Sequence, residues 1–204
     1  MKTIITIGRQ FGSGGKEVGI RVAKELGIPF YDNELLQEAA KKSGLCEKIF
    51  QNFDERPKSL LYSIAMDSYM FSLPGSGVGD SLEQQVYLAT YNTIRQIADK
   101  GPCVIIGRCA DYILRDRDDC LNVFIYAPEE VRIKTVCEFK GCTEEAARKL
   151  IEENDRMNHA RYKQMTGTYR GDRHNRHLLI DSSLLGIEGT AKYIEVLAEM
   201  AGKL

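Results

Sequence analysis

A glycine-rich turn that ends in a lysine is the part of the sequence with the clearest chemical meaning. It lies between an apolar, strand-like run at residues 4–7 and a helical pattern at residues 17–26. Glycines let successive backbone N–H groups approach anionic oxygens, and a helix N-terminus adds a partial positive charge. The pattern therefore predicts a nucleotide phosphate loop, with the lysine reaching the β and γ phosphates. Its residues are Gly12, Ser13, Gly14, Gly15 and Lys16.

This turn departs from the P-loop formula G-x-x-x-x-G-K-[ST] at two positions. Gln10 stands at the first glycine, and Glu17 replaces the hydroxyl residue that normally binds Mg²⁺. Three ways of holding the metal remain open: Glu17 binds it directly, Glu17 binds it through water, or the nucleotide, water and Ser13 hold it. The alternative structural interpretation is a glycine turn that only closes a tight strand-to-helix connection.

The stretch at residues 154–177 is strongly basic, with six Lys and Arg residues against two Asp residues. Phosphoryl transfer needs cations that neutralise phosphates in a dry site, which makes Arg156 and Arg161 candidate catalytic residues beside Lys16. Five residues apart, the two arginines lie about 140° apart around a regular helix, so they converge only from a helix end. The alternative is a solvated helix or a surface for acidic partners.

Polar residues at the ends of strand-like runs are candidates for binding an acceptor substrate, because ligands of open α/β sheets bind at the carboxyl edge. Arg108 follows the run at residues 103–106 and is a candidate for holding the acceptor phosphate. A salt bridge to Asp111, itself included among the substrate-binding candidates, is the alternative. Asp32 follows a second run and either orients an acceptor hydroxyl or a metal-bound water, or caps the helix that begins at Asn33.

The elements that must position these residues form an alternating pattern of strands and helices. Continuous apolar runs without polar alternation indicate strands that are covered on both faces, as in a parallel sheet. Strands separated by helices predict an α/β layered fold. The strands are expected at residues 4–7, 103–106, 123–126 and 178–180, with a weaker fifth at 29–31, and helices at 17–26, from a capping box at Ser81 to Gly101, from Pro128, from Thr143 toward Arg161, and at 187–200.

Composition narrows the class of protein. The chain has 204 residues, and 28 Lys+Arg against 29 Asp+Glu leave a net charge of −1, which gives no drive toward nucleic acid or acidic membranes. No apolar run reaches the roughly 20 residues of a membrane span, so a soluble, cytoplasmic protein is expected. The six cysteines lack zinc-site or redox spacing, and free thiols are expected.

Together these segments resemble the nucleoside monophosphate kinases, most closely the cytidylate kinases and the cytidylate-kinase-like family of bacterial proteins. The resemblance implies a P-loop NTPase-type three-layer sandwich with a five-stranded parallel sheet and a helical, arginine-bearing lid. It also implies transfer of the γ-phosphoryl group of ATP, with Mg²⁺, to a nucleoside monophosphate. Besides the loop, the resemblance rests on residues 106–108, 123–132 and 179–183, on Gly186, Ile187 and Glu188, and on Asn154, Asp155, Asn158 and Arg161.

The resemblance assigns the basic stretch at residues 154–177 to the lid. Arg161 occupies the place of a lid arginine, whereas the earlier lid arginine is Asn154 here, with Arg156 as its candidate replacement. Residues 31–35 differ from the motif that cytidylate kinases carry after the second strand. Residues 43–82 are a divergent acceptor-side insertion in one kinase-like domain, and their Gly/Ser-rich end is expected to be a mobile loop.

The prediction is an ATP- and Mg²⁺-dependent kinase acting on a small phosphorylated acceptor such as CMP or dCMP. A kinase for another small metabolite is the alternative within the same fold, favoured by the divergent segment at residues 43–82. A non-catalytic nucleotide sensor or interaction protein is the alternative outside it, favoured by Glu17. The expected partner is a small-molecule nucleotide rather than a membrane or a nucleic acid, and the oligomeric state is left open.

Overall fold

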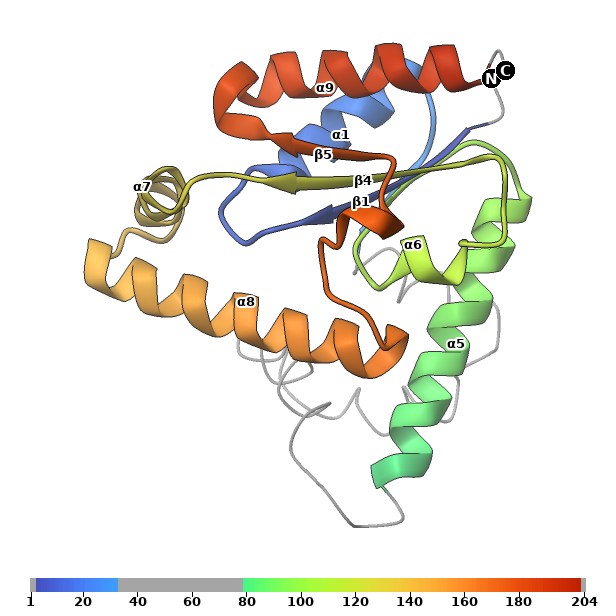
Figure 1. Cartoon of the computed structure of the whole chain (residues 1–204), viewed down its shortest axis with the longest axis horizontal. Coiled ribbons are helices and arrows are strands. Elements are labelled where there is room, and N and C mark those ends of the chain that lie inside the picture. Colours follow the sequence, from blue (N-terminus) through green and yellow to red (C-terminus); the bar gives the residue numbers. More distant parts are fainter. Residues whose placement is uncertain (1–2, 33–78, 203–204) are drawn as a thin grey trace. The chain divides into compact units, whose positions relative to one another are not determined.

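The computed structural model places five short strands side by side in one parallel sheet within the residues it describes (Figure 1). It describes residues 3–32 and 79–202, with side chains from residue 88 onward in the second range. The strand order is β2-β3-β1-β4-β5, so β1 lies in the middle of the sheet. All five predicted strands are confirmed. Their bounds are β1 (Ile4–Arg9), β2 (Phe30–Tyr31), β3 (Val104–Ile106), β4 (Cys120–Tyr126) and β5 (Leu178–Asp181).

Helices α1 (Gly15–Leu26) and α9 (Ser182–Ala201) cover one face of the sheet (Figure 1). Ile5 and Ile7 of β1 are fully buried against this layer, and they share one apolar cluster with Val18 of α1 and Ile194 of α9. Each such side chain contributes about 2 kcal/mol by leaving water. Because β1 alternates little between apolar and polar residues, both of its faces are buried, as its sequence predicts.

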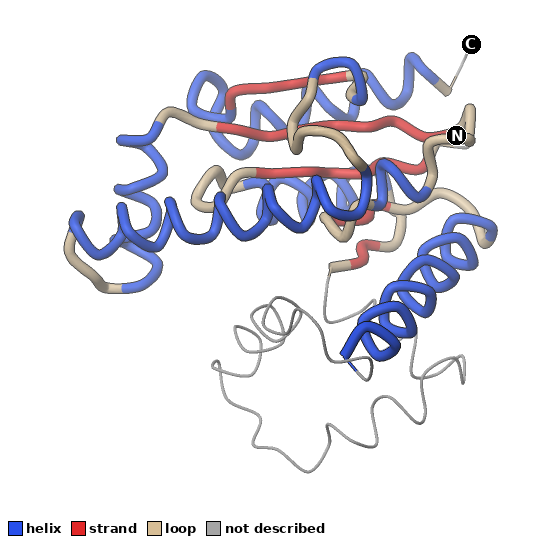
Figure 2. Tube along the Cα trace, turned by 60° about the horizontal axis from the view of Figure 1, so that its bottom comes forward, coloured by secondary structure: helices blue, strands red, loops and turns tan. Residues whose placement is uncertain are grey.

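The opposite face of the sheet is covered by α6 (Ala110–Ile113) and α8 (Glu144–Thr166), while α7 (Glu129–Lys140) lies beyond the carboxyl end of β4 (Figure 1). Figure 2 shows the strands as a layer with helices on both sides, which confirms the three-layer α/β fold. This face carries polar groups: the Thr6 hydroxyl donates to Asn122 Oδ1 over 2.6 Å, and both residues are buried. A short 3-10 helix, η1 (Arg173–Asn175), leads into β5.

Several helix ends differ from the sequence prediction. Helix α8 continues past Arg161 to Thr166, and the Thr143 hydroxyl caps its start by accepting from the Ala146 amide. Helix α9 starts at Ser182, but Gly186 has φ 64° and ψ −175°, so the regular helix begins after it as expected. Helix α5 (Gly79–Asp99) begins two residues before Ser81, so the prediction of Ser81 as its capping residue is wrong.

The chain divides into two compact units, one of residues 1–33 with 97–204 and one of residues 34–96. The predicted insertion at residues 43–82 falls in the second unit. Its residues 43–78, including the expected mobile loop, lie outside the described residues, and the others belong to α5. None of the helices described is both long enough and apolar enough to cross a membrane. The sheet and the candidate site residues belong to the first unit.

A glycine in the left-handed conformation lies at each end of α1. Gly14 precedes the helix with φ 71°, and Gly27 follows it with φ 63°. The two positions differ in their surroundings, because a Cβ on Gly14 would lie 2.3 Å from Ile187 Cδ1, whereas a Cβ on Gly27 would have no atom within 4 Å. Gly14 is therefore required both by its backbone conformation and by its contact with α9.

This difference predicts unequal stability losses for the same substitution at the two ends of α1. Gly27→Ala only places an alanine in the left-handed conformation, which lowers the free energy of unfolding by about 1 kcal/mol. Gly14→Ala adds a collision with Ile187 and is expected to lower the free energy of unfolding by about 2–4 kcal/mol. Urea denaturation followed by circular dichroism measures both losses. Equal losses for the two variants would show that Ile187 does not constrain the loop.

Candidate functional site

The glycine-rich turn connects β1 directly to α1 in the way that the sequence predicts. Gly12 and Gly14 have φ 79° and 71°, and Gly14 precedes α1 without any side-chain cap. Among the residues that the structure describes, no protein acceptor engages the amides of Gly12, Gly14 and Gly15, while the Ser13 amide has only a long 3.4 Å contact with Gln10 O. Amides at a helix N-terminus that lack protein partners are suited to an anion.

Gln10, the residue in place of the first glycine of the formula, anchors the turn to the end of β4. Its amide donates to Ile125 O over 2.9 Å, and its side-chain oxygen accepts from the Ala127 amide over 3.3 Å. The Ser13 hydroxyl, buried inside the turn, donates to Gln10 O at 2.9 Å and lies 3.3 Å from Ile125 O. The hydroxyl of Ser182 donates to Ser13 O over 2.7 Å. These side chains therefore hold the shape of the turn.

Lys16 and Asp32 come together from different elements of the sheet edge. Lys16 is the second residue of α1, and Asp32 follows β2. The Lys16 ammonium lies 2.8 Å from Asp32 Oδ2, and Asp32 is the more buried partner, with 14% of its side chain exposed against 49% for Lys16. Glu17 is exposed in the first turn of α1 and follows Lys16 in the sequence. The carboxyl end of β2 and the start of α1 thus meet in one place.

Arg108 lies in an unusual left-handed turn at the carboxyl end of β3. Gly107, Arg108 and Cys109 have φ values of 71°, 55° and 56°. A non-glycine residue in this conformation costs about 1 kcal/mol, so two in succession need support from their surroundings. Part of that support is the Gly107 amide, which donates to Ile7 O of the neighbouring strand over 3.0 Å. The turn fixes the backbone of Arg108 at the sheet edge.

Guanidinium groups from four separate places converge around this turn, and we call them the arginine cluster. The Arg9 guanidinium lies against Gly107, where a Cβ would be 2.3 Å from Arg9 Nη1. The Cys109 thiol is within electrostatic reach of the other three: burial and Asp111 raise its pKa to about 12, and the three arginines oppose that rise. The members of the arginine cluster are Arg9, Arg108, Arg161 and Arg170.

One member of the arginine cluster, Arg170, carries a buried charge that its described carboxylate partner does not fully compensate. Burial and then the charge of Arg9 lower the pKa of Arg170 to about 10, although Asp155 acts in the opposite direction. The Arg170 guanidinium donates to Arg9 O and lies 5.8 Å from the centroid of the Phe124 ring. A buried guanidinium whose pKa falls is one whose carboxylate partner does not fully compensate it. An anionic ligand here would relieve that repulsion.

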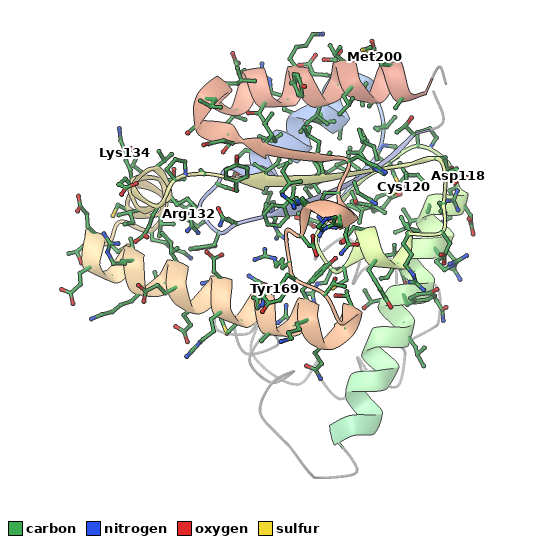
Figure 3. All side chains as sticks on the ribbon, in the orientation of Figure 1. Asp118, Cys120, Arg132, Lys134, Tyr169 and Met200 are labelled. Carbon is green, nitrogen blue, oxygen red and sulfur yellow. The ribbon has the colours of Figure 1, made fainter. Side chains whose placement is uncertain are left out.

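Asp155 joins three segments around the glycine-rich turn. Its carboxylate accepts from Arg132 Nη1 over 2.6 Å and from the Phe11 amide over 3.5 Å, and it lies 3.8 Å from Arg170 Nη1. Arg132 also donates to Phe11 O over 3.4 Å. Arg132 lies on α7 beyond one end of β4, opposite Cys120 at the other end (Figure 3). Asp155 therefore connects α8 and α7 to the turn.

The two predicted lid arginines lie in different surroundings. Arg161 belongs to the arginine cluster. Arg156 is exposed and lines a cavity of about 630 Å³ with Gln10, Asp155 and Arg170. Asp111, the other substrate-binding candidate, accepts from the Tyr162 hydroxyl over 2.6 Å and forms an ion pair with the buried Arg176.

Sequence reasoning assigned no function to Arg9 or Asp155. Arg9 ends β1 as Arg108 follows β3, and these strands are neighbours, so the rule that was applied to Arg108 would have found Arg9. Asp155 was named only as part of the lid motif, because its partners, Arg132 and the Phe11 amide, are 23 and 144 residues away. No local pattern predicts such contacts.

Comparison with known proteins identifies the family of this chain. The model of the cytidylate kinase-like family matches residues 4–184. The chain belongs to the cytidylate kinase-like family. A cytidylate kinase of Methanopyrus kandleri is 25% identical over 192 residues, which are 90% of this chain and 86% of that protein. The family assignment supports a kinase that acts on a nucleotide or another small metabolite.

Solved structures share the fold of this cytidylate kinase-like chain. An uncharacterized protein from Eubacterium ventriosum is similar with a TM-score of 0.71 and 26% identity, covering 98% of this chain and 99% of that one. A shikimate kinase from Bacteroides thetaiotaomicron matches over 98% of this chain and 99% of its own, with a TM-score of 0.54 and 13% identity. The second likeness concerns the fold alone.

The contacts of Asp155 predict a stability role that can be measured. Asp155→Asn removes the negative charge between Arg132 and Arg170 and is expected to lower the free energy of unfolding by about 2–3 kcal/mol. Asp116→Asn is the control, because Asp116 is exposed and lies 3.9 Å from Arg115. It should cost less than about 0.5 kcal/mol. Urea denaturation measures both variants, and an Asp155→Asn loss no larger than that of the control would contradict the role.

Proposed function

We propose that this protein is an ATP-dependent kinase that phosphorylates a nucleoside monophosphate, with CMP and dCMP as the first candidates. The observation that carries the proposal is that the amides of Gly12, Gly14 and Gly15, which no described residue engages, lie at the same edge of the sheet as the arginine cluster. A nucleotide donor and a phosphorylated acceptor both need such groups, because phosphoryl transfer depends on positioning and charge neutralisation. Membership of the cytidylate kinase-like family supports the same assignment.

In this proposal the residues of the turn bind the donor phosphates. The amides of residues 12–16 surround the β and γ phosphates. Gly12 and Gly15 let the turn pack closely against α7 and against the side chain of Arg9. The ammonium group of Lys16 places a positive charge beside the β and γ phosphates. Arg161, in the arginine cluster, neutralises the transferred group from α8, and Arg156 acts from the cavity that it lines with Gln10 and Arg170.

Mg²⁺ fits this site as an ion held mainly by phosphates and water. Within the described residues, no group of three or more His, Cys, Asp or Glu side chains is placed to hold a metal ion. Mg²⁺ commonly takes one or two carboxylates together with substrate phosphates and waters, and Glu17 is the candidate carboxylate. Bound there, the ion would neutralise charge on the phosphates.

Arg108 and Asp32 position the acceptor in this proposal. Both follow strands at the carboxyl edge, and the rigid left-handed turn holds the Arg108 backbone. The guanidinium binds the acceptor phosphate, which Arg is suited to do by paired hydrogen bonds. Asp32 accepts from an acceptor hydroxyl or from a metal-bound water, and Asp111 supports this side through Tyr162 and Arg176.

The first test is turnover and its dependence on Lys16. A coupled ADP-release assay with Mg²⁺, ATP and a panel of nucleoside monophosphates is expected to show turnover with CMP or dCMP. Lys16→Ala should lower kcat/KM by about 100-fold or more, because a charge on the transferring phosphates is lost. Lys24→Ala, an exposed lysine in the last turn of α1, is the control and should retain activity. ATP binding without turnover on any acceptor would defeat the enzymatic proposal, and if that binding is insensitive to Mg²⁺ it favours a nucleotide sensor.

The second test separates acceptor binding from donor binding. Arg108→Ala keeps a non-glycine residue in the same left-handed backbone and is expected to raise the KM for the acceptor at least tenfold, with the KM for ATP little changed. Arg115→Ala, at an exposed position after α6, is the control. An unchanged acceptor KM, or an equal rise in both KM values, would exclude Arg108 from acceptor binding.

A kinase for another hydroxylated metabolite is the second candidate function. It is favoured by the 2.8 Å contact between Lys16 and Asp32, because a carboxylate beside the phosphate-binding lysine can accept a hydrogen bond from an acceptor hydroxyl. Screening phosphorylated and unphosphorylated acceptors separates the two candidates. Turnover of a sugar acid or polyol, without turnover of any nucleoside monophosphate, would favour this one.

A further inference from the structure

Two cysteines lie at the elbow between α7 and α8, away from the residues assigned above. Cys137 is in the last turn of α7, and Cys142 is the second residue after that helix. Both are half-buried, and both are free. They pack against one apolar cluster that contains Ile133, Val136, Ala147 and Ile151, which connects the two helices.

The C-cap of α7 brings the two thiols together. Gly141 adopts the left-handed conformation with φ 62°, and its amide donates to Cys137 O over 2.8 Å. A helix end of this type turns the chain back, so that the second residue after the helix contacts the residue whose carbonyl accepts that bond. Here these residues are Cys142 and Cys137. Burial raises the pKa of Cys137, and the charge of Cys142 adds to the rise.

The other described cysteines differ from this pair in reactivity. Burial raises the pKa values of Cys103, Cys109 and Cys120 to about 12, and all three are almost inaccessible. They remain protonated near neutral pH and are protected from reagents, as expected for structural thiols. Cys137 and Cys142 are more exposed and adjacent, which is the arrangement that disulfide exchange requires.

We propose that Cys137 and Cys142 form a dithiol site that a small disulfide such as oxidised glutathione converts into an intramolecular disulfide. One cysteine loses its proton, and its sulfur attacks a glutathione sulfur, which breaks the glutathione disulfide and releases one glutathione. The second cysteine loses its proton and displaces the other glutathione from the mixed disulfide. The protein loses two electrons and two protons, and the glutathione disulfide is reduced to two thiols.

The dithiol site adjoins the glycine-rich turn. Phe11 packs against the same apolar cluster as the two cysteines, and Val136 Cγ2 is 3.0 Å from the position of a Cβ on Gly12. A bond between residues 137 and 142 therefore fixes the elbow from which α8 carries Asp155 and Arg161. We expect oxidation to lower turnover reversibly, a consequence that rests on the proposed kinase function.

Peptide mapping of the full chain tests the disulfide directly. The protein is incubated with oxidised glutathione, its remaining thiols are alkylated, and trypsin is added. Cleavage after Lys134, Lys140 and Arg148 separates the cysteines into peptides 135–140 and 141–148. The expected product is these two peptides linked, about 2 Da lighter than their sum because two hydrogens are lost. Cys103, Cys109 and Cys120 should be found alkylated only after unfolding.

Cys137→Ser and Cys142→Ser are matched variants, each of which keeps one thiol. Each should lose the linked peptides and hold a glutathione on its remaining cysteine. Because a raised pKa leaves less thiolate at neutral pH, the rate of cross-linking in the wild-type chain should rise as pH increases from 7 to 9. Separate glutathione adducts on both cysteines of the wild-type chain, or a disulfide from either one to Cys46, would overturn the proposal.

Phenylarsine oxide provides a measurement that does not depend on oxidation or on activity. Its trivalent arsenic bonds to two adjacent thiols, so the wild-type chain should bind one equivalent through peptides 135–140 and 141–148, and each serine variant should bind none there. Absence of this adduct in the wild-type chain would also overturn the proposal. If the disulfide forms but no acceptor is turned over, the proposed function fails and the dithiol site stands. If turnover occurs and no disulfide forms, the dithiol site alone fails.

Discussion

Burial of arginine charge between the sheet and α8 is the constraint on which this side of the structure depends. A buried guanidinium is tolerated only with compensating groups, and the loss of one partner from such a pair is costly. Asp111 compensates Arg176, and Asp155 compensates Arg132 at 2.6 Å while lying 3.8 Å from Arg170. The pKa of Arg170, lowered by burial and by Arg9, marks where this compensation is incomplete. The ion pairs that stabilise the fold and the positive charge that suits an anionic ligand thus result from the same charge distribution.

The sheet and the glycine-rich turn could be predicted from the sequence because their signals are local. The apolar runs gave all five strands, since a strand buried on both faces must lack polar alternation. The turn was recognisable because strand, glycines, lysine and helix follow one another without a gap. The weak run at residues 29–31 was correctly predicted to contain a strand. In the structure Phe30 and Tyr31 pair with Val104 and Ile105 of β3.

The charge pairing could not be predicted because its partners are distant in the sequence. The basic stretch at residues 154–177 showed only a net positive charge, and nothing in it distinguished Arg176, buried beside Asp111, from the exposed Arg173. That distinction depends on which residues face the polar side of β4. There the centroid of the Phe124 ring lies 5.8 Å from the guanidinium carbons of both Arg170 and Arg176. Residues 43–78 carry the rest of the acceptor-side prediction, and they lie outside the described residues.

The glycines of the turn have two explanations that act together. Gly12 faces the backbone of α7, Gly14 faces Ile187 of α9 and Gly15 faces the side chain of Arg9, so close packing alone would require all three. Glycine content is therefore weak evidence for phosphate binding. The stronger evidence is what the packing leaves unused: Gln10, Ser13 and Ser182 hold the turn through carbonyl oxygens and side chains, while the amides of Gly12, Gly14 and Gly15 are not engaged by any described residue. A turn that served only to connect β1 to α1 would gain stability by satisfying those amides.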